Sequence, residues 1–258
     1  MRTSLLLSAA CLTSAIGANV ALAAGTVLFD SHGFETPYYT AGSLAGQNGW
    51  ITDGTGAATV QSAIVQGGSQ AVELSGTAST WHYPALNYTP GAGEVISIST
   101  GIYRGSSAAA TKNFGFFLDA YNSDVERIAR VGLAYNAGAV VLAATLGGTS
   151  PGTYLITTPA LSFDTWYDLK MDLNYGAQTF DVYLDNVLYG SDLPFFSAAV
   201  DLADVDLMMS FSTGATDKGY FDNYTVTATT VPEPGSMALA ALGGLALLTI
   251  RRRSTLRA

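Results

Sequence analysis

Residues 166–175 alternate between apolar and polar side chains, and this pattern constrains the fold of the chain more than any other feature. A period of two places successive side chains on opposite faces of a β-strand, whereas an amphipathic helix needs a period of about 3.6. The segment therefore predicts a strand with one buried face. The residues expected on that face are Tyr167, Leu169, Met171, Leu173 and Tyr175.

Short alternating or apolar runs recur along the chain between turn signals. Residues 180–184 continue the alternation after a loop around Gly176, and Asp185-Asn186 is a pair that tolerates the positive φ of a tight turn. Many short strands separated by turns predict an antiparallel β-sandwich or barrel, and no Pro- or Ser-rich linker divides it. Further strands are expected at residues 27–30, 57–65, 71–75, 95–104, 114–121, 127–135, 140–145, 154–157, 187–189, 204–212 and 219–228.

The C-terminal segment has a different character. Val231-Pro232-Glu233-Pro234 precedes residues 235–250, which carry no charge, and the arginines Arg251, Arg252 and Arg253 follow. The prolines block helix propagation, so a helix can begin only after Pro234. Sixteen uncharged residues make roughly 24 Å of helix, less than the roughly 30 Å hydrocarbon core of a bilayer. We expect transient membrane insertion with the arginines on the cytoplasmic side; a permanent membrane anchor is the alternative.

The tail at residues 231–258 resembles the PEP-CTERM sorting signal of exported Gram-negative bacterial proteins. The Pro-Glu-Pro motif, the short apolar helix and the terminal basic residues 251–258 stand in the order typical of that family. The resemblance implies that an exosortase in the inner membrane recognises and removes the tail. It also implies a role among the extracellular polysaccharides of a biofilm or matrix, at the cell surface or beyond it.

The N-terminus is typical of a signal peptide at residues 1–23. Arg2 precedes an apolar stretch, and Ala21 and Ala23 supply the small side chains that signal peptidase requires, so the mature chain should begin at Ala24. A lipoprotein signal at Cys11 is the alternative, although no large aliphatic residue stands three positions before it. Because Cys11 is the only cysteine, the mature protein would contain neither a disulfide nor a cysteine metal site.

Charge narrows the choice of partner for the domain at residues 24–230. Outside the leader and the tail, 6 basic and 19 acidic residues remain, a net charge of about −13. This field repels phosphate backbones, so we expect no nucleic-acid partner.

Two passages of the domain resemble concanavalin A-like, laminin-G-like jelly rolls. Residues 163–169 and 180–186 are similar to the tryptophan strand and the short hairpin of that family. Residues 219–226 are similar to its last strand, which pairs beside the first, and residues 34–50 to the opening of its exported bacterial members. The implied fold is an all-β antiparallel sandwich between a signal helix and a short C-terminal hydrophobic helix.

Catalytic patterns are weak in this sequence. Glycoside hydrolases need two carboxylates about 5 to 10 Å apart. Asp204 and Asp206 would share one strand face at roughly 7 Å, but we interpret them as a solvated strand face. Residues 148–152 match the letters of a G-x-S-x-G nucleophile motif, yet no helix follows and Pro151 favours a turn. We therefore expect that the protein is not an enzyme, and a polysaccharide-acting enzyme is the competing hypothesis. The domain's glutamates are scattered: Glu35, Glu73, Glu94 and Glu126.

Two kinds of binding site are candidates. Jelly rolls of the kind resembled often hold a structural calcium ion between the first and last strands, which would place Asp30, Glu35 and Asp222 as its ligands. Exposed rings at Trp50, Trp81 and Tyr83 could stack on sugars, and Trp81 and Tyr83 alternate around His82, so they would point the same way. No other cofactor is expected. The sequence thus predicts an exported structural, adhesive or glycan-binding protein of the extracellular matrix.

Overall fold

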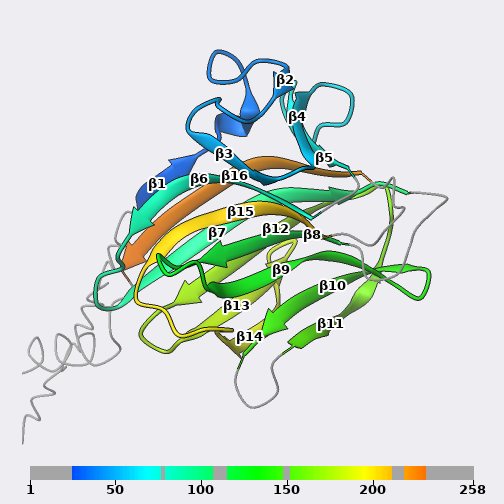
Figure 1. The fold of residues 1–258 in the computed structure, drawn as a ribbon. Coiled ribbons are helices and arrows are strands. Elements are labelled where there is room, and N and C mark those ends of the chain that lie inside the picture. Colours follow the sequence, from blue (N-terminus) through cyan, green and yellow to red (C-terminus); the bar gives the residue numbers. More distant parts are fainter. Residues whose placement is uncertain (1–24, 77–78, 107–114, 148–151, 211–217, 231–258) are drawn as a thin grey trace, which may run out of the picture.

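The computed structural model describes residues 25–76, 79–106, 115–147, 152–210 and 218–230. Within these ranges two antiparallel sheets pack face to face, so the prediction of an all-β sandwich is confirmed (Figure 1). The predicted signal peptide, the sorting tail and most of the G-x-S-x-G turn lie outside the described residues. None of the helices in the described ranges has the length and apolar character to cross a membrane.

One sheet has nine strands in the order β14, β13, β12, β7, β16, β5, β4, β2, with β1 also paired to β16. Figure 1 shows β2, β4 and β5 gathered at one end of the molecule, beside the short 3-10 helix η1 (His32–Phe34). The strands are β1 (Thr26–Asp30), β2 (Gly42–Ser43), β4 (Ala57–Gln61), β5 (Ala71–Ser75), β7 (Glu94–Arg104), β12 (Trp166–Asn174), β13 (Thr179–Leu184), β14 (Val187–Pro194) and β16 (Gly219–Thr230).

The other sheet has seven strands in the order β11, β10, β9, β8, β15, β6, β3, and this order can be followed in Figure 1. These strands are β3 (Trp50–Gly54), β6 (Thr80–Tyr88), β8 (Gly115–Tyr121), β9 (Arg127–Asn136), β10 (Ala139–Leu146), β11 (Gly152–Leu161) and β15 (Leu202–Ser210).

Alternation along the strands builds the core between the sheets. In β12 the side chains of Leu169, Met171 and Leu173 are buried, as the period of two predicts. Trp166 is only half-buried and packs against Tyr103, because the same alternation turns it to the other face of the sheet.

The first and last strands of the domain lie side by side. β1 pairs with β16 from Thr26 opposite Ala228 to Asp30 opposite Thr225, which confirms the expected pairing. β16 also pairs with β7 and with β5, so the last strand of the domain lies inside its sheet.

The sequence-based prediction misses two strands that matter for the site. β3 and β6 were interpreted as loops or strand ends, because glycines surround β3 and Pro84 interrupts β6. In the structure β6 pairs with β15 on one side and β3 on the other. The prediction also ends β11 too early, at residue 157 in place of Leu161.

Candidate functional site

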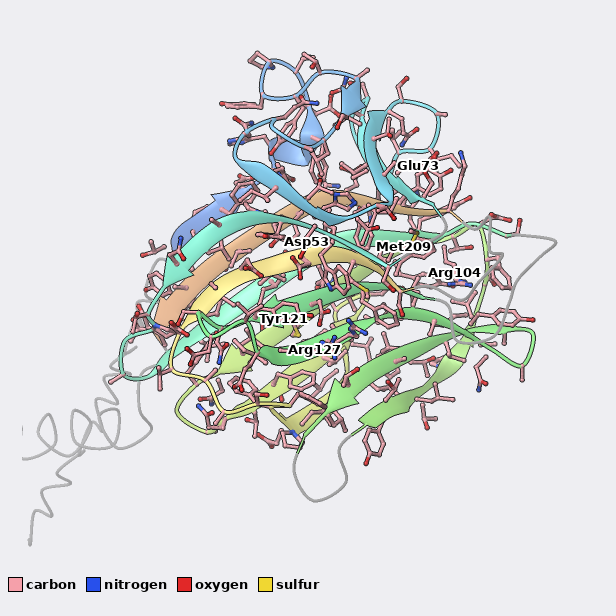
Figure 2. The ribbon with its side chains drawn as sticks, in the orientation of Figure 1. Asp53, Glu73, Arg104, Tyr121, Arg127 and Met209 are labelled. Carbon is pink, nitrogen blue, oxygen red and sulfur yellow. The ribbon has the colours of Figure 1, made fainter. Side chains whose placement is uncertain are left out.

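A hollow of about 370 Å³ lies on the outer face of the seven-stranded sheet, the face turned away from the sandwich core. Figure 2 shows three of the surrounding residues, Asp53, Tyr121 and Arg127, following one another across this sheet. The volume falls within the usual range of small-molecule sites. The residues that line the hollow are Asp53, Trp81, Tyr83, Tyr121, Asn122, Ser123, Val125, Ala203, Asp204 and Asp206.

Strand alternation places the two carboxyl groups of β15 in this hollow. Val205 and Leu207 are buried in the core between the sheets, so Asp204 and Asp206 point to the outer face. Asp206 nevertheless exposes only 2% of its surface. The interpretation of these residues as a solvated strand face is therefore wrong, because the neighbouring strands cover them.

The register between β15 and β8 sets a third carboxylate beside the pair. Asp119 lies directly opposite Asp206, and Tyr121 lies opposite Asp204. On the next strand Arg130 lies opposite Asp119. Cross-strand neighbours in an antiparallel pair have Cβ atoms about 5 Å apart, so the site is a compact row of charged side chains.

Burial favours the protonated forms of Asp204 and Asp206. Burial away from solvent and, as the smaller cause, the charge of Asp119 raise the pKa of Asp204 to about 7. Burial also raises the pKa of Asp206 well above its usual value, and the charges of Asp204 and Asp119 add to this effect. Two interacting carboxyl groups titrate as a pair. Near neutral pH this pair can therefore both donate and accept a proton.

Two arginines hold the side chain of Asp119. Arg127 donates from Nε to Oδ1 of Asp119 over 2.7 Å, and Arg130 donates from Nη2 to Oδ2. The hydroxyl of Tyr121 also donates to Asp119 over 3.2 Å. Both guanidinium groups are thus engaged behind the hollow, and neither is among its lining residues.

Several polar atoms at this face are buried without a partner. Among the side chains that the structure describes, Oδ1 of Asp206, Nε1 of Trp81 and Oγ1 of Thr145 have no hydrogen-bond partner. Buried polar atoms in native proteins are almost always satisfied by protein, water or ligand. The unpartnered atoms at Asp206 and Trp81 therefore mark places where a bound molecule could accept or donate a hydrogen bond.

Trp81 and Tyr83 both line the hollow, which confirms that they point the same way. His82 between them faces the other side of β6 and contacts Oγ1 of Thr52 at 2.9 Å. Burial lowers the pKa of His82 to about 4, so it is neutral and takes no part in the hollow. The signal that could have identified this strand is the alternation Trp81, Tyr83 in a run that Pro84 interrupts.

The proposed surface role of Trp50 is wrong. Its side chain exposes 2% of its surface, and its Nε1 donates to the hydroxyl of Tyr39 over 2.9 Å. The ring packs against Phe29, Phe34 and Tyr224. Strand β3 turns this residue inward, so a sugar cannot reach it.

The three predicted calcium ligands do not form a common ligand set. Asp222 accepts backbone N–H groups of Gln66 and Gly67 over 3.0 and 3.1 Å. Glu35 accepts from the backbone of Ser69 and Gln70, and Asp30 accepts from the backbone of His32. In the described part of the chain no three acidic, histidine or cysteine side chains converge as metal ligands. Calcium binding stays a prediction.

A second hollow, of about 460 Å³, lies on the outer face of the nine-stranded sheet around Gln66, Asp168 and Lys170. Gln66 donates from Nε2 to Asp168 over 2.6 Å, and Lys170 donates to Asp172 over 2.6 Å. Gln66 and Lys170 are thus already engaged in hydrogen bonds, although Oδ1 of Asp172 has no partner. The hollow on the seven-stranded sheet is the better candidate for chemistry because its carboxyl groups are buried, perturbed and partly unsatisfied.

The domain is thus a β-sandwich with an acidic, aromatic-edged hollow on one sheet. Residues 230–253 match the family model of the PEP-CTERM protein-sorting motif. The predicted sorting motif is therefore confirmed. It supports a sorted, exported protein, destined for the cell envelope or surface and processed by an exosortase during export.

No curated protein matches the sequence of the chain. Among solved structures, a carbohydrate esterase from Shiga toxin-encoding bacteriophage phi24B is similar, with 16% identity and a TM-score of 0.54 over 80% of this chain and 100% of the esterase. A sialidase gives 8% identity and a TM-score of 0.51 over 78% of this chain, which spans 18% of the sialidase. An endo-β-1,4-glucuronan lyase from Trichoderma reesei gives 14% identity and a TM-score of 0.49 over 76% and 95% of the chains.

These comparisons contradict the prediction that the protein is not an enzyme. The esterase and the sialidase are carbohydrate-active enzymes that contain a sandwich of this fold. The prediction rested on the scattered glutamates and on the interpretation of Asp204 and Asp206 as a solvated strand face, and it did not include Asp119, which lies opposite Asp206 in the sheet. At these identities the likeness establishes the fold. The narrower concanavalin A-like and laminin-G-like resemblance stays a prediction.

Proposed function

We propose that the exported domain hydrolyses glycosidic bonds of a polysaccharide, with Asp204 and Asp206 as its acid–base pair. The observation that carries this proposal is the pair of neighbouring carboxyl groups whose pKa values burial raises, that of Asp204 to about 7 and that of Asp206 well above its usual value. Such perturbed groups in a hollow are typical of proton-transfer sites. The carbohydrate-active neighbours agree with this choice of substrate.

The chemistry needs one group that gives a proton and one that takes a proton. Asp206, the more deeply buried carboxyl, would protonate the glycosidic oxygen as the bond between that oxygen and the anomeric carbon breaks. Asp204, once ionised, would take a proton from the water whose oxygen forms the new bond to the anomeric carbon. Each turnover moves one proton from acid to leaving group and one from water to base.

Strand geometry suggests the stereochemical course of the reaction. The Cα atoms of residues two apart on one strand are roughly 7 Å apart. Carboxyl groups at the same separation would lie within the about 6.5 to 9.5 Å that leaves room for a water between them. This spacing favours inversion at the anomeric carbon. Retention would need carboxyl groups only about 5 Å apart.

The aromatic edge of the hollow would hold the sugar chain. Trp81 and Tyr83 lie on one strand and Tyr121 lies across the hollow from them, and all three line it. Rings of this kind present flat apolar faces with a polar handle. The buried, unpartnered Nε1 of Trp81 supplies a donor for a sugar oxygen.

The sorting tail places this activity outside the cell. We take the substrate to be an extracellular polysaccharide of a biofilm or matrix of a Gram-negative bacterium. On this view the tail inserts transiently in the inner membrane before the exosortase removes it. The concanavalin A-like type of sandwich is compatible with such a role.

The test uses the full chain, purified in mild detergent, and a panel of soluble polysaccharides. We expect release of reducing ends without ultraviolet-absorbing unsaturated products. Asp206→Asn should reduce the rate by about 100-fold or more, whereas Asp192→Asn, an exposed site on the other sheet, should leave it unchanged. Unsaturated products would indicate an elimination reaction and overturn the hydrolytic assignment. Equal rates for Asp206→Asn and the unsubstituted chain would also overturn it.

A further inference from the structure

We infer that the hollow on the seven-stranded sheet accepts sugar units without carboxylate groups and excludes polyuronates. This inference rests on the proposed function for its ligand class, and it deepens that function by naming the charge of the substrate. It follows from which charged groups line the hollow and from where the nearby cations point.

The lining of the hollow is acidic. Asp53 on β3 and Asp204 and Asp206 on β15 line it, and no lysine, arginine or histidine is among the described residues that do so. A bound uronate would bring a further negative charge to within a few ångströms of this group. Like charges at such a distance repel strongly where water is partly excluded.

The two nearest cations, Arg127 and Arg130, already form ion pairs. Arg127 and Arg130 both hold the fully buried Asp119, from the side of β9. The guanidinium of Arg127 lies over the Tyr121 ring at 5.8 Å, and that of Arg130 lies over the Phe117 ring at 5.2 Å. Neither arginine lines the hollow, so pairing with a uronate there would draw a guanidinium away from a carboxylate that has no exposure to water. Such a rearrangement abandons a buried charge, which costs more than a new exposed pair returns.

Protonation of the acidic pair couples this selectivity to pH. The groups that face the pair are Asp53, Tyr83, Asp119, Tyr121, Arg127 and Arg130, and only the two arginines carry positive charge. An added carboxylate would favour protonated Asp204 and Asp206. Any residual binding of a polyuronate must therefore take up protons and strengthen as the pH falls.

The experiment compares polymers that differ only in charge. Mixed-linkage β-glucan and galactomannan, which both carry free C6 hydroxyls, are each cast into native gels, beside the same polymer oxidised to carboxylates at C6. We expect the full chain to be retarded by at least one uncharged polymer. The oxidised form should bind it roughly tenfold more weakly at pH 8, with the gap narrowing at pH 5.

Asp53→Asn removes one lining charge and should reduce this discrimination, whereas Asp192→Asn removes the same charge from an exposed site of the other sheet and should not. Equal or stronger retardation by the oxidised polymers overturns the inference, and so does retardation by none of the uncharged polymers.

Cleavage assays on the same polymers separate the two proposals. Selective binding without release of reducing ends would refute the hydrolytic function and leave the charge selectivity standing. Cleavage of the oxidised polymers at the same rates as the uncharged ones would refute the charge selectivity and leave the hydrolytic function standing.

Discussion

Arg127 donates from Nε to Oδ1 of Asp119 over 2.7 Å, and the Asp119 side chain has no exposure to solvent. This ion pair connects β9 to β8 directly beneath the candidate site. It neutralises the negative charge of Asp119, which would otherwise lie uncompensated next to Asp206. The pair therefore supports the fold of the sheet and limits how far the charge of Asp119 raises the pKa values of Asp204 and Asp206.

Removing this carboxylate should be costly. Asp119→Ala leaves Arg127 and Arg130 without their shared partner, and we expect a loss of about 3 to 5 kcal/mol in the free energy of unfolding. Denaturant titration measures it. The matched control is Asp172→Ala, which breaks the partly exposed pair with Lys170 and should cost about 1 kcal/mol or less. Equal losses for the two variants would show that Asp119 is not a buried anchor.

The carboxyl pair should make the protein less stable as the pH rises. The pKa of Asp204 is about 7 in the folded chain against 3.8 unfolded, and burial also raises the pKa of Asp206 well above 3.8. Stability from protonated carboxyls is complete below the unfolded value and is lost as the pH rises through the folded value. His82, with its lowered pKa, destabilises the fold only below about pH 6.5.

The interval from pH 6.5 to 8 therefore isolates the two aspartates. Melting temperature should fall across this interval in the unsubstituted chain and stay level in the Asp204→Asn, Asp206→Asn double variant. A parallel fall in both proteins would assign the effect to other groups.

Activity should depend on pH through the same groups. If Asp204 is the base, the rate on an uncharged polysaccharide should fall below about pH 7, where Asp204 becomes protonated. Asp204→Asn should abolish this acidic limb along with most of the rate. Proton NMR of the first product should show an inverted anomer, and a retained anomer would contradict the assigned spacing.

Substitution of Trp81 should weaken sugar binding, whereas substitution of Trp50 should lower the stability of the fold. Trp81→Ala should weaken retention by the polysaccharide about tenfold or more, because its ring lines the hollow. Trp50→Ala removes a buried ring and should cost about 3 to 5 kcal/mol of stability. Gel retardation and denaturant titration on both variants test this. The reverse pattern would move the sugar site away from the hollow.

Calcium can be tested by removing it. The oxygens of Glu35 and Asp222 already accept backbone N–H groups, so we expect a chelator to leave the melting temperature unchanged. A fall of several degrees, reversed by calcium and absent in Asp222→Asn, would support the predicted ion.

The sorting tail makes a prediction that concerns neither site. Mass spectrometry of the exported protein should find a C-terminus upstream of Arg251, because the exosortase removes the basic end. Substitution of Pro232 and Pro234 by Ala should leave the full tail attached. Cells that export the unsubstituted chain with Arg251, Arg252 and Arg253 in place would favour the permanent anchor.

The alternation of apolar residues predicted most of the strands because burial enforces the period of two at positions such as Leu169 and Met171. It also placed Asp204 and Asp206 on one face. The alternation could not predict that other side chains bury this face, because Asp119 lies opposite Asp206 on a strand about 90 residues away in sequence. Trp50 is buried where we expected an exposed ring, because the sequence does not show which face of the sheet a ring at the start of a strand will take.

The placement of β16 between β7 and β5 has a consequence for biogenesis. The interior of the larger sheet stays unfilled until the final residues of the domain, Gly219–Thr230, have emerged. Those residues directly precede the sorting motif at 230–253. The larger sheet can therefore close only once the chain has emerged up to the start of its sorting tail.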